Sequence, residues 1–249
     1  MEPILSVEHL RRDYGGRGSV THAVDDVSFS VERGEFVGIM GASGSGKSTL
    51  LNCIATIDTP TAGHIRVEGQ DVTALKGRSL SRFRRERLGF VFQDCNLLDT
   101  LTAFENIALA LTIRGTPAGE IEGRVKETAE LLGITDCVNK YPYQMSGGQR
   151  QRTAAARAII TDPALVLADE PTGALDSHTG REVLGLLQQL HQQGHTVVLI
   201  THDNSIAVQA DRIIRLEDGR VVYDGDSHAP EAMVQPTLLP ETPEKEGQA

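Results

Sequence analysis

The chain has 249 residues, of which 39% are hydrophobic and 23% charged, and it carries a net charge of -10. These proportions are ordinary for a globular protein with a packed core, and the acidic balance argues against a general nucleic-acid binder, which usually shows a basic surface. The three cysteines, Cys53, Cys95 and Cys137, lie far apart and form no CxxC pattern, which argues against a disulfide framework or a zinc site.

Apolar and alternating segments predict a β-rich first third of the chain. Residues 27–32 (VSFSVE) alternate apolar and polar side chains, which is the period of a half-buried strand. Residues 36–40 (FVGIM) form an apolar run, which is typical of a strand buried on both faces. Residues 63–72 (GHIRVEGQDV) alternate again. The first residues lack a basic stretch followed by an apolar one, so we expect no signal peptide.

Helical patterns dominate the middle of the chain, at residues 80–89, 101–115, 120–134 and 146–162. In the third of these segments, Ile121, Val125, Ala129 and Leu132 recur near the helical period of about 3.6 residues. Gly133 then provides a typical stop signal. No apolar run approaches the roughly 18 residues that span a bilayer, so we expect any membrane role to require a partner.

The last third of the chain alternates strands and helices. Buried strands are predicted at residues 164–169 and 196–202, with an amphipathic helix at 181–194 between them. Residues 211–225 predict a hairpin that turns at residues 217–219, where Asp-Gly is the turn signal. This alternation predicts an α/β fold with a parallel sheet, into which the helical middle is inserted.

The composition changes over residues 226–249. This segment holds four prolines, an excess of acidic residues and no periodicity, so we predict a disordered tail. A tail that binds a partner is the alternative, although loose termini are common.

Residues 41–48 (GASGSGKS) match the pattern G-x-x-x-x-G-K-[ST] between a predicted strand and a predicted helix. Backbone N–H groups of such a loop can surround a phosphate, and the following helix adds the positive end of its dipole. Lys47 is placed to reach the β- and γ-phosphates of a nucleotide, and the Ser48 hydroxyl to bind Mg²⁺. A glycine turn with a chance lysine is the alternative. The predicted binding residues here are Gly41, Ala42, Ser43, Gly44, Ser45, Gly46, Lys47, Ser48 and Thr49.

Two carboxylates end the apolar run LVLADEP at residues 165–171. A buried strand rarely carries charge at its end without a partner for that charge. Asp169 is predicted to anchor Mg²⁺, and Glu170 to act as the base that polarises an attacking water. A solvated carboxylate pair is the alternative. A switch-type GTPase is disfavoured, because Pro142 stands where the guanine-reading motif N-K-x-D needs aspartate.

A second candidate anion site lies at residues 145–152 (MSGGQRQR). Ser146 can cap the following helix, and the amides of Gly147 and Gly148 lie at its N-terminus. A single nucleotide has no obvious need for two phosphate-binding elements. The alternative is an ordinary glycine-containing turn before a helix.

Together these motifs resemble those of ABC-transporter nucleotide-binding subunits. MSGGQ is similar to the family's signature motif, in which Met145 replaces the usual leucine. The resemblance covers residues 3–225 and implies a P-loop NTPase core with an N-terminal antiparallel β subdomain. It places the β subdomain and P-loop core at residues 1–92 and 163–225, and a helical subdomain with the signature at residues 93–162.

The resemblance also implies roles for single residues. Tyr14 would stack on adenine, Gln93 would contact Mg²⁺ or water, and the D-loop would lie at residues 173–176, with Asp176. His202 would contact the γ-phosphate. The implied catalytic residues are Glu170, His202 and Lys47, and the implied Mg²⁺ ligands are Ser48, Gln93 and Asp169.

In the family two ATPase chains dock head to tail, and each signature closes over ATP held by the other chain. Ser146, Gly147, Gly148 and Gln149 would therefore act in trans, in a homodimer with two ATP–Mg²⁺ sites. Hydrolysis would drive a membrane permease, which places the chain in the cytoplasm on the inner face of the cell membrane.

Three stretches, residues 49–72, 91–111 and 168–177, resemble the branch of lipoprotein-release, macrolide-export and bacitracin-resistance ATPases. Within it, residues 55–63 and 96–109 are most similar to the bacitracin-resistance, antimicrobial-peptide type. Permeases of this branch carry a large extracytoplasmic domain, so such a permease is the implied partner. The branch predicts export or mechanical work outside the membrane.

A soluble ABC ATPase that acts on nucleic acid or ribosomes is the alternative function. The basic run at residues 76–87 would suit it, but Phe83 is the only aromatic residue there and the whole chain is acidic. Such proteins usually have two cassettes or long coiled-coil insertions, and this chain has neither. We therefore expect no nucleic-acid partner and interpret the basic run as a solvated helix face.

Overall fold

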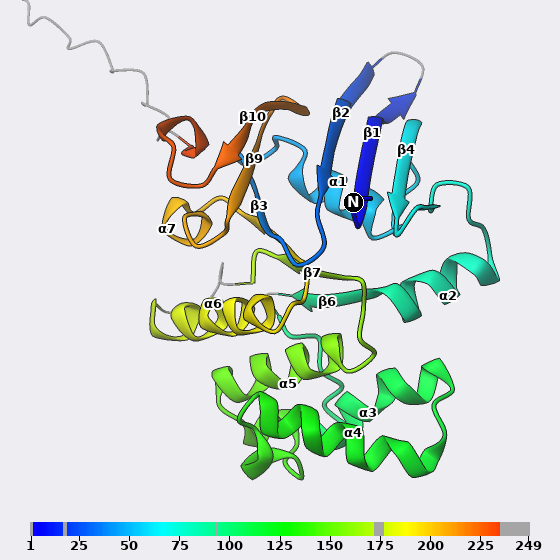
Figure 1. The fold of residues 1–249 in the computed structure, drawn as a ribbon, viewed down its shortest axis with the longest axis vertical. Coiled ribbons are helices and arrows are strands. Elements are labelled where there is room, and N and C mark those ends of the chain that lie inside the picture. Colours follow the sequence, from blue (N-terminus) through cyan, green and yellow to red (C-terminus); the bar gives the residue numbers. More distant parts are fainter. Residues whose placement is uncertain (1, 17–18, 93, 172–176, 235–249) are drawn as a thin grey trace, which may run out of the picture.

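The computed structural model describes residues 2–16, 19–92, 94–171 and 177–234, and for residues 177–179 the backbone alone. Two sheets and a group of helices are stacked along the long axis of the molecule (Figure 1). The first sheet is antiparallel and has the strand order β2-β1-β4-β5. Its strands are β1 (Leu5–Gly16), β2 (Ser19–Val31), β4 (Ala62–Val67) and β5 (Gln70–Asp71).

The second sheet has the order β10-β9-β3-β8-β7-β6, and its strands are parallel except for β10. They are β3 (Phe36–Met40), β6 (Leu88–Phe92), β7 (Leu165–Asp169), β8 (Val197–Thr201), β9 (Arg212–Glu217) and β10 (Arg220–Asp226). Met40 pairs with Thr201, and Asp169 with Ile200, so β3, β7 and β8 end together. This shared edge is where side chains that follow the strands can meet.

The helix α1 (Lys47–Ile54) lies between the two sheets (Figure 1). Its buried residues, among them Leu50 and Ile54, share one core with the inner faces of both sheets. The opposite face of the parallel sheet packs on α5 (Gly147–Ile159), α6 (Ser177–Gln192) and the short α7 (Asn204–Ala207). The strands read as continuous apolar runs because both of their faces are covered.

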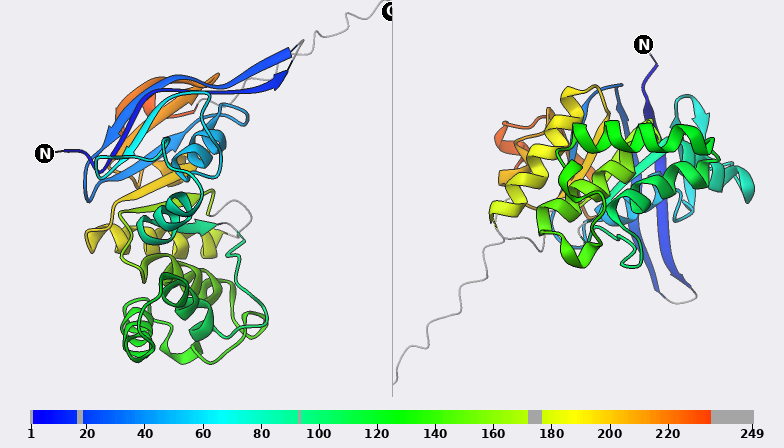
Figure 2. Two further views of the ribbon diagram at one scale, coloured as in Figure 1. Left: turned by 90° about the vertical axis from the view of Figure 1, so that its right-hand side faces the viewer. Right: turned by 90° about the horizontal axis from the view of Figure 1, so that it is seen from below.

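A helical part lies at the far end of the molecule from the antiparallel sheet (Figure 2). It contains α3 (Ala103–Arg114), α4 (Ala118–Leu131) and α5, with short 3₁₀ turns at Thr135–Cys137 and Pro142–Gln144. A capping box between Thr102 and Glu105 begins α3. The amphipathic pattern that predicted α4 is confirmed for Val125 and Ala129, which are fully buried.

The predicted fold class is confirmed: an α/β core with a parallel sheet, an antiparallel N-terminal sheet and inserted helices. Several boundaries differ from the prediction, and two of these differences change how a segment folds. Residues 63–72 form two strands joined by a turn, because Glu68 and Gly69 both have positive φ. The helix expected at residues 80–89 is α2 (Arg78–Arg87) and ends before Leu88, because the apolar run LGFVF is buried as β6.

The chain after β10 also differs from the composition-based prediction. Residues 227–234 pack against the rest of the molecule through a 3₁₀ turn at Pro230–Ala232, and Ala232 is fully buried. Residues 235–249 lie outside the described part of the chain. Among the helices that the structure describes, none has both the length and the apolar character that a bilayer crossing requires.

Candidate nucleotide site

The glycine-rich loop joins the end of β3 to the start of α1, as its sequence predicts. Gly46 has a φ of 100°, and a Cβ atom there would lie 2.1 Å from the carbonyl oxygen of Ala23. The amide of Gly219 donates to the Ser45 carbonyl at 3.1 Å. The loop is thus pressed against β2 and the turn between β9 and β10, at a place where only glycine fits.

Lys47 is the first residue of α1, and its side chain is buried. Its Nζ donates to the carbonyl oxygens of Gly41 (2.8 Å) and Ala42 (2.9 Å). Burial lowers the pKa of Lys47, while the charges of Glu170 and Asp169 act in the opposite direction. The ammonium group therefore lies inside the loop whose phosphate ligand it is predicted to bind. Ser48 and Thr49 follow in the first turn of α1, whose N–H groups have no partner within the helix.

Glu170 and His202 come together across the shared edge of the sheet. Glu170 follows β7 and His202 follows β8, and Glu170 Oε1 lies 3.1 Å from His202 Nδ1. The Glu170 backbone is held by a hydrogen bond from its N–H to the Ile200 carbonyl (3.0 Å) and has a φ of 40°. A left-handed backbone at a residue other than glycine is strained, and such strain is concentrated at functional sites.

A cavity of about 340 Å³ opens beside this pair. It is lined by Ser48, Phe92, Asp94, Asn96, Asp169 and Glu170. Burial and the neighbouring Glu170 raise the pKa of Asp169, against the effect of Lys47. The polar groups of this cavity are hydroxyl, carboxylate and amide oxygens, which are the ligand types that Mg²⁺ prefers. The residues present therefore fit a bound Mg²⁺, with Ser48 and Asp169 as its candidate protein ligands.

Asp94 and Asn96 were not predicted from the sequence. They follow β6 just as Glu170 follows β7, and β6 pairs with β7 in parallel. Because the ends of adjacent parallel strands meet at one edge, polar residues after β6 could have been considered. The helix predicted for residues 80–89 overlaps the start of β6, so neither this strand nor these two residues was predicted.

The motif at residues 145–149 begins α5. The Ser146 hydroxyl accepts from the Gln149 N–H (3.2 Å), and Gln149 Oε1 accepts from the Ser146 N–H (3.1 Å), so the predicted cap is confirmed. Met145 is buried, as an apolar replacement for leucine should be. The cavity beside Glu170 is lined by none of the residues 146–149. This motif is thus shaped as a helix N-terminus but lies outside that cavity.

Tyr14 lies near the end of β1 and is 40% exposed. Its hydroxyl donates to Asp58 Oδ2 at 2.5 Å, and the Arg12 guanidinium carbon lies 4.5 Å from its ring centre. An exposed aromatic ring held from two sides is a suitable stacking surface. Gln93 and Asp176 lie outside the described residues.

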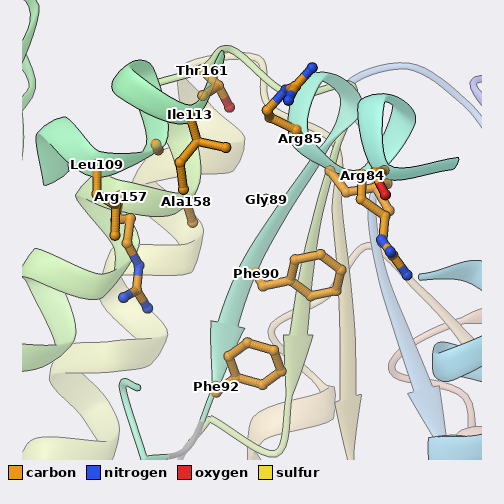
Figure 3. A pocket seen from close by; sticks show the side chains of 13 residues that line it. Arg84, Arg85, Gly89, Phe90, Phe92, Leu109, Ile113, Arg157, Ala158 and Thr161 are labelled. Carbon is orange, nitrogen blue, oxygen red and sulfur yellow. The ribbon is translucent and has the colours of Figure 1, made fainter. Parts of the chain in front are cut away.

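A second hollow, of about 430 Å³, lies between α2, α3, α5 and the strand β6 (Figure 3). Phe90 and Phe92 project into it from β6, with their rings stacked at 5.5 Å. Ile113 of α3 faces them and is 55% exposed. Three cationic side chains lie at the rim of the hollow: Arg84, Arg85 and Arg157. We refer to this hollow as the α2–α3 groove.

Comparisons with known proteins point to one family. A family model described as "ABC transporter" matches residues 24–173. The macrolide export ATP-binding/permease protein MacB of Aggregatibacter actinomycetemcomitans is 46% identical over 221 residues, covering 89% of this chain and 34% of that protein. MacB of Brucella melitensis is 43% identical over 237 residues, covering 94% and 37%. The chain spans about a third of the length of these relatives.

Solved structures agree with the sequence relatives. A dimeric post-hydrolysis state of the ATP-binding cassette MJ0796, bound to ADP and Pi, has a TM-score of 0.79 at 38% identity and covers 90% of this chain and 99% of that chain. CbiO1 of Clostridium perfringens, part of the ABC transporter complex cbiONQ, has a TM-score of 0.81 at 29% identity and covers 91% and 90%. Macrolide export was one of the three predicted branch members, whereas the finer resemblance to the bacitracin-resistance type stays a prediction.

Proposed function

Because this chain belongs to the ABC transporter family and has the fold of that family's ATPase cassettes, we propose that it hydrolyses ATP to drive a membrane permease. The observation that carries this proposal is the convergence at the edge of the parallel sheet. The glycine-rich loop with Lys47, the carboxylates of Asp169 and Glu170, and His202 come from three strands and meet there.

The geometry supports a division of labour among these residues. The loop amides and Lys47 would hold the β- and γ-phosphates. To do so, the Lys47 ammonium group would give up its hydrogen bonds to the two loop carbonyls and donate to phosphate oxygens instead. Glu170 would accept a proton from the attacking water, and His202, at 3.1 Å, would orient the Glu170 carboxylate and contact the γ-phosphate. Tyr14 would stack on the adenine ring.

Mg²⁺ would be held by Ser48 and Asp169, and by Gln93, which lies outside the described residues. Bound there, the ion neutralises charge that develops on the phosphate oxygens. Burial and the charge of Glu170 raise the pKa of Asp169, and a cation bound there would oppose both effects.

We propose a head-to-tail homodimer in which Ser146, Gly147, Gly148 and Gln149 complete the site of the other chain. The separation of this motif from the cavity beside Glu170 supports the arrangement, as do the dimeric MJ0796 cassettes. Asp176 of the D-loop would lie at the same interface. Within this proposal residues 3–225 form the ATPase domain, with residues 1–92 and 163–225 as its β and P-loop part and 93–162 as its helical part.

The proposed partner is a permease with an extracytoplasmic domain, for export of the macrolide, lipoprotein or antimicrobial-peptide type or for mechanical work. Its support is the name of the MacB relatives, "ATP-binding/permease protein", together with the match of this chain to about a third of their length. The α2–α3 groove, with an apolar floor and a cationic rim, suits a cytoplasmic segment of that permease (Figure 3). In this proposal the chain would lie in the cytoplasm, on the inner face of the membrane.

The structure gives no support to a nucleic-acid role for the basic run on α2. Arg82 pairs with Glu86 (3.0 Å), and Arg87 pairs with Glu68 (2.7 Å). Phe83 is buried and so is not available for stacking on bases. Two arginines of the run thus already have carboxylate partners within the protein, and its aromatic ring is enclosed.

Substitution of Glu170 tests the proposed mechanism. Glu170→Gln should still bind MgATP but lose at least about a hundredfold in kcat, because the amide cannot accept the proton. It should also accumulate as a dimer with ATP. Steady-state hydrolysis and size-exclusion chromatography with ATP measure both effects, and Glu120→Gln on the exposed start of α4 is the control. Normal turnover by Glu170→Gln would refute the role.

The partner is tested by purification from detergent extract. We expect the tagged chain to recover a permease, and Ile113→Asp in the α2–α3 groove to reduce that recovery at least about fivefold, because a buried charge opposes apolar docking. Val222→Asp on β10, which is 47% exposed, is the matched control. Recovery of ribosomes without a membrane protein would contradict the proposal.

A further inference from the structure

The segment that follows β10, Ser227–Val234, runs back over β9 and β10 and ends beside α7 (Figure 1). We refer to it as the C-terminal strap. Ser227 and Ala232 are buried, and the 3₁₀ turn at Pro230–Ala232 lies against β9 and β10. Met233 and Val234 pack on the core that covers this face of the parallel sheet. The strap is therefore anchored before it reaches α7.

The strap is joined to α7 by a reciprocal pair of hydrogen bonds. Asn204 Nδ2 donates to the Val234 carbonyl at 3.0 Å, and the Val234 N–H donates to Asn204 Oδ1 at 3.0 Å. One side-chain amide thus satisfies both backbone groups of one residue, as a neighbouring strand would. Such a pair fixes the position of both partners more narrowly than a single bond does.

Asn204 lies two residues after His202 and is the first residue of α7, which packs on the core through Ile206 and Ala207 at its other end. Asp203 caps α7 by accepting from the Ser205 N–H (2.8 Å), and its own N–H donates to Thr201 Oγ1 (3.0 Å). The helix itself has a single turn, Asn204–Ala207, and a helix this short is marginal without tertiary contacts. The His202 side chain is 59% exposed, so packing around the ring does little to hold it.

We propose that Asn204 is a positioning residue, held by the C-terminal strap, that keeps His202 in line with Glu170. The inference rests on the proposed catalytic role of His202. Val234 also lines a hollow of about 520 Å³ together with the glycine-rich loop, residues 41–45. The end of the strap thus borders the loop proposed to hold the phosphates, and through Asn204 it is bonded to the segment that carries the histidine proposed to contact them. Freeing the strap would allow His202 more positions, and only some of them are productive.

Two substitutions disrupt the hydrogen bonds between Asn204 and Val234, one at each residue. Asn204→Ala removes both hydrogen bonds, whereas Val234→Pro removes the N–H donor and leaves Asn204 intact. Met233 has a ψ of 139°, the extended conformation that a following proline requires. Asn204→Asp keeps the acceptor for the Val234 N–H and should rescue part of the effect. Gln209→Ala is the control, because Gln209 bonds instead to Gln188 of α6 (2.8 Å).

The experiment measures MgATP hydrolysis, thermal unfolding and hydrogen exchange of the full chain. We expect kcat to fall about tenfold in Asn204→Ala and Val234→Pro, with KM for ATP within about twofold of the starting value. Exchange at residues 203–207 should rise at an unchanged unfolding midpoint. Gln209→Ala should change none of these quantities.

Two results would overturn the inference and leave the proposed function in place. One is normal kcat in both variants while His202→Ala is inactive. The other is a parallel loss of kcat, KM and unfolding midpoint, which would mean that the strap merely stabilises the fold. Normal hydrolysis by His202→Ala would instead remove the proposed role of the histidine and the inference that rests on it.

Discussion

At the scale of single residues, the glycine-rich loop combines backbone strain with close packing. Gly44 and Gly46 both have positive φ, of 83° and 100°. A side chain at Gly44 would meet open space, whereas one at Gly46 would meet the Ala23 backbone at 2.1 Å. Gly44 is therefore required by its backbone conformation alone, and Gly46 by its conformation and its close contact. Substitution of each glycine by alanine can distinguish the two effects.

We expect Gly46→Ala to lower the free energy of unfolding by at least about 3 kcal/mol, because the strain of a positive φ adds to the collision with Ala23. Gly44→Ala should lower it by about 1–2 kcal/mol through strain alone. Denaturant unfolding without nucleotide measures both changes. Equal losses in the two variants would show that the contact with Ala23 is unimportant.

At the scale of elements, α5 is tied to the segment that follows β6. The Arg157 guanidinium donates to the carbonyls of Asn96 (2.7 Å) and Cys95 (2.8 Å), and both of these residues have positive φ. Burial lowers the pKa of Arg157. The helix that Ser146 caps is thus linked through its last turn to Asn96, which lines the cavity beside Glu170.

Removal of this tie should destabilise the protein. Arg157→Ala should lower the free energy of unfolding by about 2–4 kcal/mol, because two carbonyls lose a charged donor in a partly buried place. Arg82→Ala breaks an exposed pair with Glu86 and should lower it by less than about 0.5 kcal/mol. Chemical denaturation compares the two, and similar losses would contradict the structural role of Arg157.

At the scale of the whole molecule, the two candidate phosphate-binding elements belong to different parts of the fold. The glycine-rich loop lies under the antiparallel sheet, and Ser146 begins a helix of the helical part (Figures 1 and 2). Within a single chain, Ser48 at the end of the first motif lines the cavity beside Glu170, and none of residues 146–149 does. The proposed second copy would supply the other.

Mixing two inactive chains tests this arrangement. Lys47→Ala disables the loop and Ser146→Arg disables the motif at α5, so one intact site should form in the mixed dimer. We expect the mixture to regain up to about a quarter of the starting hydrolysis rate, because half of a random mixture is heterodimer with one good site of two. No rate above that of either mutant, despite dimer formation, would count against action in trans.

The motifs that identify the family are runs of consecutive residues, and such runs can be recognised before any fold is known. Residues 41–48, the carboxylates at 169 and 170 and the cap at Ser146 all lie where their patterns predict. The strands that precede these motifs can also be predicted from the sequence, because a strand buried on both faces requires an unbroken apolar run. Periodicity placed α4 correctly for the same reason: one face of the helix meets the core.

Contacts between residues far apart in the chain could not be predicted in this way, because they depend on how the elements pack. Asp94 and Asn96 line the cavity beside Glu170 only because β6 pairs with β7, and no local sequence pattern specifies that pairing. The acidic, proline-rich composition after β10 predicted disorder, yet Ala232 is buried and Val234 bonds to Asn204. A short segment can be ordered by a surface formed elsewhere, and that surface exists only once β9, β10 and α7 have come together.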